Sequence, residues 1–443
     1  MRYILDTKTL NNLDMTPDLI IQFGPRSILS LVGIIILMIG VWYVDRTWDE
    51  KGSAAYARAK AKGGDGNAVV IPEADLDAAF PFPIVFILGW LIFASSYLFS
   101  TSGGTALQDL SPVTIAAIFF SLVLAVVASV PMGNAVRYRK KGLKMKLSMM
   151  FVLSWVGLTI VSGLATGTGA PSFILGGLGA VCIVASMKLL WKYRKMGDSW
   201  EQNGAPNPKP IVYNMGGPLF VFGWFLFWVA MASATGGVVE GGLPIYFNLR
   251  TALAMFAGLG MVPLVMMLDY AHDEGGTYVG LGTSGAHFGR FFEGPIPFFT
   301  FWILFGLSSF IALDGSFMQP DTRHWLLLAT GALQAVIAGG FIQTALYKGN
   351  MVLKTRLSMI FVLLFLALAI NIGFDGGPAR YLALAGAFFA IMGQMTVFKD
   401  RKRGDYWMKH GTPNPNPIVY SVGEPLFTTG WILLALAMSL PMV

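Results

Sequence analysis

Three residues with metal-ligand chemistry lie close together near the middle of the chain. Asp269, His272 and Asp273 occupy positions i, i+3 and i+4, which places them on one face of a helix. Carboxylates and an imidazole on one face can bind a divalent metal ion. The alternative is the acidic, solvated end of a helix before a pair of glycines, which needs no ligand.

Four amide side chains lie inside otherwise apolar segments: Gln334, Gln343, Asn371 and Gln394. Such residues can line a path for a neutral solute, or they can join helices through hydrogen bonds worth roughly 0.6–2 kcal/mol. At about 100° per residue, Gln334 and Gln343 fall on opposite faces of one helix. These two residues therefore cannot both line the same path.

Other patterns that carry chemistry are missing from the sequence. The single Cys182 excludes an internal disulfide and a cysteine-based metal cage. We find no serine nucleophile signature and no glycine-rich phosphate loop. The apolar segments hold almost no ionisable residue, which argues against a proton-coupled antiporter, a voltage sensor or a pump for charged substrates. The sequence thus predicts neither an enzyme nor a cofactor.

The composition is that of a membrane protein. Hydrophobic residues make up 55% of the 443 residues, charged residues only 12%, and the mean hydropathy is +0.63. The net charge of +7 is explained by basic loops beside anionic lipid, so we expect the lipid bilayer and no nucleic acid as a partner.

A helix needs about 20 apolar residues to cross roughly 30 Å of hydrocarbon. Backbone groups in lipid must be paired within the segment, so long apolar runs predict helices and not barrel strands. The sequence therefore predicts an all-α polytopic protein of about twelve transmembrane helices, at 27–44, 82–101, 112–135, 146–165, 172–193, 216–234, 249–270, 294–313, 324–347, 357–373, 380–398 and 423–440.

Lysine and arginine predict the orientation of these helices, because basic loops stay on the cytoplasmic side. Loops on the other side hold only Arg250, Arg323 and Arg380, the N-terminal tail aside. Both termini are then expected outside, and the cytoplasmic loops are 45–81, 136–145, 194–215, 271–293, 348–356 and 399–422.

The chain contains an internal duplication. Residues 143–153 (LKMKLSMMFVL) match 353–363 (LKTRLSMIFVL) at 8 of 11 positions, and 204–224 match 411–431 at 14 of 21. Each copy holds an even number of spans, so the two six-helix repeats are expected to run parallel. The predicted organisation is a tail at 1–26, a first repeat at 27–234, a connecting loop at 235–248 and a second repeat at 249–443.

The duplicated segment around PNPxP predicts a structural loop that braces each repeat. Its prolines fix φ and favour extended backbone, and a proline then opens the next helix. A binding site for a cytoplasmic partner is the alternative. The residues of this loop are Trp200, Pro206, Asn207, Pro208, Pro218 and Trp224, repeated as Trp407, Pro413, Asn414, Pro415, Pro425 and Trp431.

Two functions fit these features best, and a membrane enzyme or cofactor carrier, suggested only by the 269–293 loop and by scattered Gln, Asn and His, is a third. Parallel duplicated six-helix repeats recur in transporters, which predicts a carrier or facilitator for a small neutral or weakly polar solute at the interface of the repeats. Short outer loops and the near absence of charge in the apolar segments favour instead a structural or assembly protein that packs a specialised membrane. Lateral self-association or other membrane proteins would then be its partners. In both cases the predicted location is integral and multi-pass.

Overall fold

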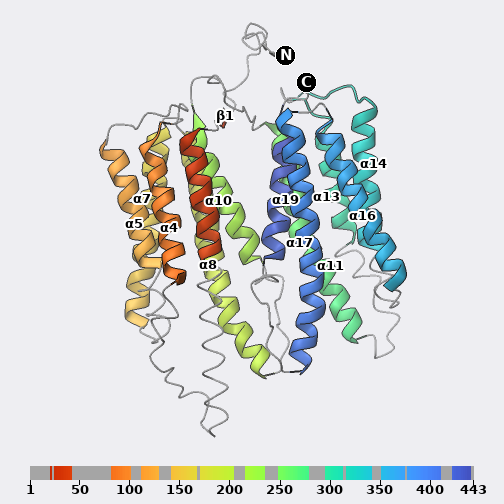
Figure 1. Ribbon diagram of the computed structural model, residues 1–443, viewed down its shortest axis with the longest axis horizontal. Coiled ribbons are helices and arrows are strands. Elements are labelled where there is room, and N and C mark those ends of the chain that lie inside the picture. The colour runs from red at the N-terminus through yellow and green to blue at the C-terminus, as the bar shows by residue number, and fades with distance from the viewer. Residues whose placement is uncertain are drawn as a thin grey trace. The chain divides into compact units, whose positions relative to one another are not determined.

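The computed structural model describes residues 20–21, 24–41, 81–100, 111–128, 141–166, 170–203, 215–234, 248–278, 295–312, 316–341, 351–374, 377–410 and 422–440. Within these ranges the chain forms twelve helices, so the predicted helical class is confirmed (Figure 1). The chain divides into two compact units. The first unit is Ile21–Leu243 with Lys399–Pro425, and the second is Met1–Ile20, Pro244–Phe398 and Leu426–Val443.

The first unit begins with the helix Pro25–Val41, drawn in red in Figure 1. The two-residue strands β1 (Ile20–Ile21) and β2 (Ser233–Ala234) pair with each other. The 3₁₀ turn η2 (Ser96–Leu98) follows α4 directly. The remaining helices are α4 (Pro81–Ser95), α5 (Pro112–Ala128), α7 (Lys141–Thr166), α8 (Ala170–Asn203) and α10 (Gly216–Ala232).

The second unit contains a π-helical segment, η4 (Ile337–Phe341), which continues directly from α14 (Thr322–Val336). The unit packs α11 against α13, α13 against α14, and α14 against α16. Its other helices are α11 (Leu249–Tyr278), α13 (Pro295–Ser308), α16 (Met351–Ile372), α17 (Gly377–His410) and α19 (Gly423–Met438).

Side-chain burial explains why these helices form bundles. Along α7, Trp155 and Leu158 are buried, whereas Met149, Leu153 and Ile160 are exposed by roughly half or more. The buried face carries the large ring, and the exposed face carries aliphatic chains. Among the residues that the structure describes, three helices are long and apolar enough to cross a membrane, at Gly142–Ala165, Ser172–Leu189 and Thr355–Ile372.

The starts of α5 and α14 are marked by polar caps. The hydroxyl of Ser111 accepts the backbone N–H of Thr114 at 3.1 Å, at the start of α5. Asp321 does the same for α14, where it forms a capping box with His324. These caps fix the first turn of α5 and α14.

Three expectations from the sequence were wrong in detail. Trp200 and Trp407, expected in loops, lie in the last turns of α8 and α17. Both helices continue through charged residues that favour helix, and they end just before a glycine and the PNPxP prolines. Arg26, expected in the N-terminal tail, is instead the second residue of the first helix and is buried.

Candidate functional site

The core of the first unit is a cluster of tryptophan rings. Trp90 of α4, Trp155 of α7 and Trp224 of α10 meet with ring centroids 5.2–6.0 Å apart. Edge-to-face and tilted contacts of this kind are favoured between aromatic rings. Phe93 and Phe227 pack against Trp224 in the same cluster.

A cavity lies beside this cluster, and its wall includes residues from all six helices of the first unit. The cavity is small, with a volume of about 20 Å³, which is room for about one water molecule. Val41 and Ala128, the last described residues of the first helix and of α5, lie in its wall. The surface of the cavity is apolar throughout.

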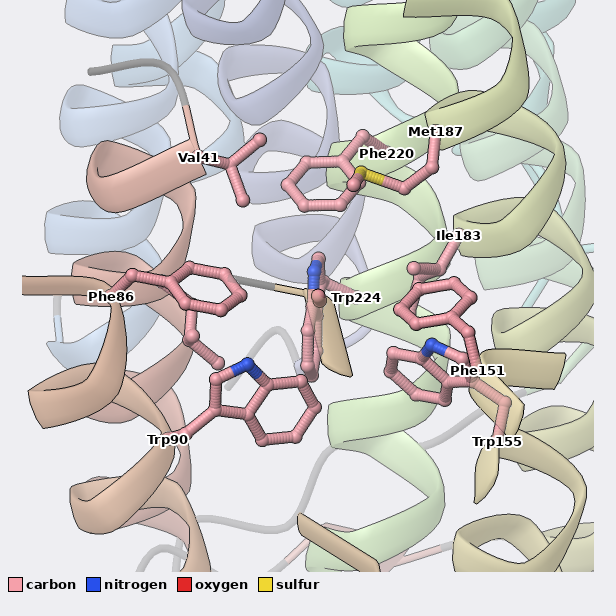
Figure 2. A pocket seen from close by; sticks show the side chains of 11 residues that line it. Val41, Phe86, Trp90, Phe151, Trp155, Ile183, Met187, Phe220 and Trp224 are labelled. Atoms are coloured by element: carbon pink, nitrogen blue, oxygen red, sulfur yellow. The ribbon is translucent and has the colours of Figure 1, made fainter. Parts of the chain in front are cut away.

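The indole nitrogens of Trp90, Trp155 and Trp224 are buried and have no hydrogen-bond partner among the described residues. In Figure 2 all three nitrogens lie on the side of their rings where Val41 and Phe220 are drawn. A buried tryptophan N–H usually finds a partner, because leaving it unpaired costs about 1–3 kcal/mol. The aromatic core beside the cavity therefore contains three donors that lack acceptors among the described residues.

The core of the second unit has the same kind of cluster. Trp302 of α13 and Trp431 of α19 lie 4.9 Å apart between ring centroids, and Phe365 of α16 contacts both. The duplicated segments 143–153 and 353–363 are offset by 210 positions. With the same offset, Phe365 corresponds to Trp155. The second cluster thus has phenylalanine where the first has its third tryptophan.

Gln334 is the most buried of the predicted site residues. Its side chain has 0% exposure, and neither amide atom has a hydrogen-bond partner among the described residues. It lies three residues before Ile337, where the π-helical segment η4 begins. One turn earlier, Gly331 lies against Trp302 of α13. The same offset of 210 pairs Gln334 with Leu124 of the first unit, which is equally buried.

The other amides are placed differently. Gln394 of α17 is buried, and its side-chain oxygen has no partner in the described part of the chain. Asn371 of α16 is half-buried, and Gln343 lies outside the described residues. Since Gln334 has no partner among the described residues, no hydrogen bond joins it to Gln394.

The proposed metal ligands lie on one continuous helix, because α11 runs through Asp269, His272 and Asp273. Their side chains fall outside the described part of the structure, so metal binding there stays a prediction. Among the side chains that are described, no group of three or more His, Cys, Asp or Glu residues is arranged to hold a metal.

The residues of the duplicated segment divide into two groups. Pro218 and Pro425 lie in the first turns of α10 and α19 and are buried, as are Trp224 and Trp431 in the two aromatic clusters. The side chains of Trp200 and Trp407 are not among those described. Outside the described residues altogether lie Pro206, Asn207, Pro208, Pro413, Asn414 and Pro415.

The sequence reasoning missed a buried polar cluster near the start of the first helix. The guanidinium of Arg26 lies 5.2 Å from the centre of the Tyr97 ring, and only 3% of Arg26 is exposed. The Tyr97 hydroxyl is hydrogen-bonded to Ser162 and also contacts the Met231 sulfur. A signal was available: Arg26-Ser27 near the start of one repeat resembles Arg250-Thr251 near the start of the other, and Arg250 is also buried.

Comparisons with protein families, with curated proteins and with solved structures found no match to this chain.

Proposed function

We propose that the chain is a multi-pass membrane protein built from two six-helix repeats, and that it carries or facilitates the passage of a small neutral or weakly polar solute. The membrane part of this proposal is supported by the outer faces of the helices. Large aliphatic side chains such as Leu153, Val181 and Leu363 are more than 60% exposed. Large apolar side chains this exposed on many helices are unfavourable in water and suit lipid.

Matching contacts in the two units support the repeat. Gly179 of α8 and Gly223 of α10 approach so closely that a Cβ on either would lie within 2.8 Å of the other helix. Gly386 of α17 and Gly430 of α19 make the same close approach. The segments 204–224 and 411–431 differ by 207 positions, as do both glycine pairs.

Gln334 is the observation that carries the proposed transport. A primary amide offers both donors and an acceptor, and here none of them is used by the described residues. A neutral solute with hydroxyl or amide groups can satisfy both atoms, whereas an ion would also need a counter-charge. The adjacent π-helical turn supports this assignment, because such turns are frequent at functional sites.

The experiment is a flux assay with purified full-length protein in liposomes, followed by light scattering after an osmotic step. Glycerol and urea serve as neutral solutes, and sodium gluconate serves as a charged one. We expect faster re-swelling than in protein-free liposomes for at least one neutral solute and no change for gluconate. Equal rates with and without protein for every neutral solute would contradict the proposal.

The tight glycine crossings and ring-filled cores also favour a second candidate, a structural membrane protein. Both features build rigid bundles and need no solute. A structural protein should form ordered lateral arrays in the same liposomes without any flux. Electron microscopy of the proteoliposomes separates the two functions, because a carrier does not require arrays.

A further inference from the structure

One of the duplicated segments lies mostly on exposed helix surface. Residues 143–153 of α7 and 353–363 of α16 are identical at 8 of 11 positions, yet only Leu147 is buried in the first copy. In the next eleven residues, 154–164, six are buried, but only three are identical to their counterparts in 364–374. Substitutions on an exposed surface usually have little effect on stability, so such positions are free to diverge after a duplication. Identity on this exposed surface therefore indicates that something contacts it in both units.

On α7, a cation lies at the end of a stripe of exposed apolar side chains. Lys146 is exposed. Met149, Met150 and Leu153 follow it at i+3, i+4 and i+7, and their exposed fractions are 58%, 48% and 64%. Residues at these spacings share one face of a helix. The face that α7 turns outward thus combines a positive charge with an apolar track.

The second unit repeats this arrangement on α16. Arg356 is exposed and takes the place of Lys146, so the positive charge is kept where the residue type changes. Met359, Ile360 and Leu363 follow at the same three spacings, with exposed fractions of 63%, 43% and 62%. Each position of the stripe is therefore apolar and similarly exposed in both units.

The helices that carry these cations contain no acidic residue to balance them. Neither α7 nor α16 contains Asp or Glu, and the segments 136–140 and 348–350 before them hold basic residues and no acidic ones. Within the described part of the chain, the ion pairs all involve Asp321, which lies on neither helix. The complementary partner is therefore an anion, and the apolar stripe beside each cation suits hydrocarbon.

A phospholipid with an anionic headgroup supplies both parts. Its phosphate carries charge at the membrane surface, while its acyl chains lie against the apolar faces of helices. Exposed apolar side chains continue along α7 beyond the stripe, where Val156, Ile160 and Leu164 are 51%, 48% and 56% exposed. A soluble phosphate would contact only the cation, so it would not account for the duplicated apolar residues.

We propose that each unit binds one phospholipid with an anionic headgroup, through Lys146 of α7 in the first unit and through Arg356 of α16 in the second. The phosphate pairs with the cation, and an acyl chain lies along the apolar stripe. This inference rests on the membrane placement proposed above and not on the transport, so a flux assay without effect would leave it standing.

The test counts bound lipids by native mass spectrometry of the purified full-length protein, released from a mild detergent. The protein is titrated with dioleoyl phosphatidylglycerol and, separately, with dioleoyl phosphatidylcholine, whose headgroup has no net charge. We expect one phosphatidylglycerol per unit to bind before any further lipid, and no such step with phosphatidylcholine. Equal binding of the two lipids would mean lipid contact without headgroup preference and would overturn the proposal.

Two variants locate the sites. Lys146→Gln and Arg356→Gln each remove one cation, so each should weaken the binding of one phosphatidylglycerol about fivefold. The double variant should lose the preference over phosphatidylcholine. Lys188→Gln is the matched control, because Lys188 is an exposed lysine of α8 whose counterpart, at the offset of 207, is Met395. A loss as large for Lys188→Gln would overturn the assignment, since it would report general charge and not the duplicated sites.

Two further measurements on the same samples exclude other partners. Glycerol 3-phosphate carries the phosphate without acyl chains, so it should not displace phosphatidylglycerol; displacement would mean a site for a soluble phosphate. If the stripes bound a second copy of the chain, the double variant would change the ratio of dimer to monomer and leave the lipid count unchanged. Either of these outcomes would overturn the proposal.

Discussion

The hydroxyl of Tyr97 is a polar group that the first unit buries and satisfies within itself. Only 1% of Tyr97 is exposed, and its hydroxyl pairs with Ser162, which is 2% exposed. The ring also lies beside the buried guanidinium of Arg26, at a distance typical of a cation–π contact. This side chain therefore links a polar contact of α7 to the start of the first helix.

Tyr97→Phe should lower the free energy of unfolding by about 1 kcal/mol, because it leaves the Ser162 hydroxyl without this partner and keeps the ring. The measurement is equilibrium unfolding in mild detergent with a denaturing detergent. Tyr381→Phe is the matched control, since Tyr381 is 74% exposed. Equal stability of the two variants would show that the buried hydrogen bond does not contribute.

The N-terminal cap of α14 depends on pH, because its capping residue is Asp321. The hydrogen bond from the backbone N–H of His324 is the main cause that lowers the pKa of the Asp321 carboxyl below its ordinary value of 3.8. Contacts with the His324 ring and with the backbone N–H of Arg323 lower this pKa further. A lowered pKa means that the folded chain favours the charged carboxylate. This stabilisation is complete above 3.8 and is lost as the pH falls through the lower folded-state pKa.

Asp321→Asn keeps an acceptor at the cap but cannot titrate. The unfolding temperature of the wild type should therefore fall more steeply than that of Asp321→Asn as the pH drops below 3.8, and the two should run parallel at higher pH. Thermal unfolding followed by circular dichroism across this range is the measurement. Parallel curves throughout would mean that the cap does not depend on the charge.

Single residues were the part of the structure that the sequence predicted least. Gln334 was identified because an amide in an apolar run is unusual, whereas its lack of a partner depends on neighbours from other helices. Trp224 and Trp431 were grouped with the bracing segment, at the openings of the predicted helices 216–234 and 423–440, and burial shows that both rings lie in bundle cores. An aromatic residue near a helix end suits the lipid interface and the core equally well, so pattern alone cannot separate them.

At the scale of elements, the crossing of α8 and α10 depends on two glycines. A Cβ added at Gly223 would lie 2.8 Å from the carbonyl oxygen of Gly179 and 2.8 Å from the backbone nitrogen of Ile183. Backbone atoms cannot move aside as a flexible side chain can. Small residues at such crossings let helices pack closely where burial of apolar area gives no driving force.

Gly223→Ala should cost about 1–3 kcal/mol, because the added methyl forces the two backbones apart. Gly430→Ala should cost a similar amount in the second unit, where the Cβ would meet the backbone of Ala390. Gly177→Ala is the control on α8, since nothing lies within 4 Å of a Cβ there. Thermal unfolding in detergent measures all three, and a loss as large for Gly177→Ala would contradict the close approach as the cause.

Hydropathy predicted where helices exist but not where several of them end. The predicted segments 172–193 and 380–398 correspond to α8 and α17, which continue to Asn203 and His410. A hydropathy limit marks where apolar residues stop, and the helix itself continues until a glycine or proline interrupts it. A prediction based on the thickness of the lipid therefore misses the polar part of a helix that extends beyond the membrane.

At the scale of the whole molecule, the two units share a plan and differ in a few buried positions. Both have a tryptophan-based core and one glycine crossing at paired positions. The second unit has Gln334 where the first unit has Leu124. The first unit has a third tryptophan in its cluster, Trp155, where the second unit has Phe365. The duplication is visible in the sequence because many residues are identical at paired positions. The importance of the differing positions follows only from their burial in the structure. The expected path at the interface of the repeats stays a prediction.

Glycerol or urea flux through Gln334→Leu is the measurement that tests the proposed transport most directly. Leucine is the residue at the paired position of the first unit, so the variant should fold, while the solute loses its polar partner. Leu333→Ala, at a side chain that is 48% exposed on the same helix, is the control. We predict that Gln334→Leu lowers the initial rate about tenfold, equivalent to about 1.4 kcal/mol, and that Leu333→Ala does not change it. Wild-type flux through Gln334→Leu would contradict the assignment of Gln334 to the solute path.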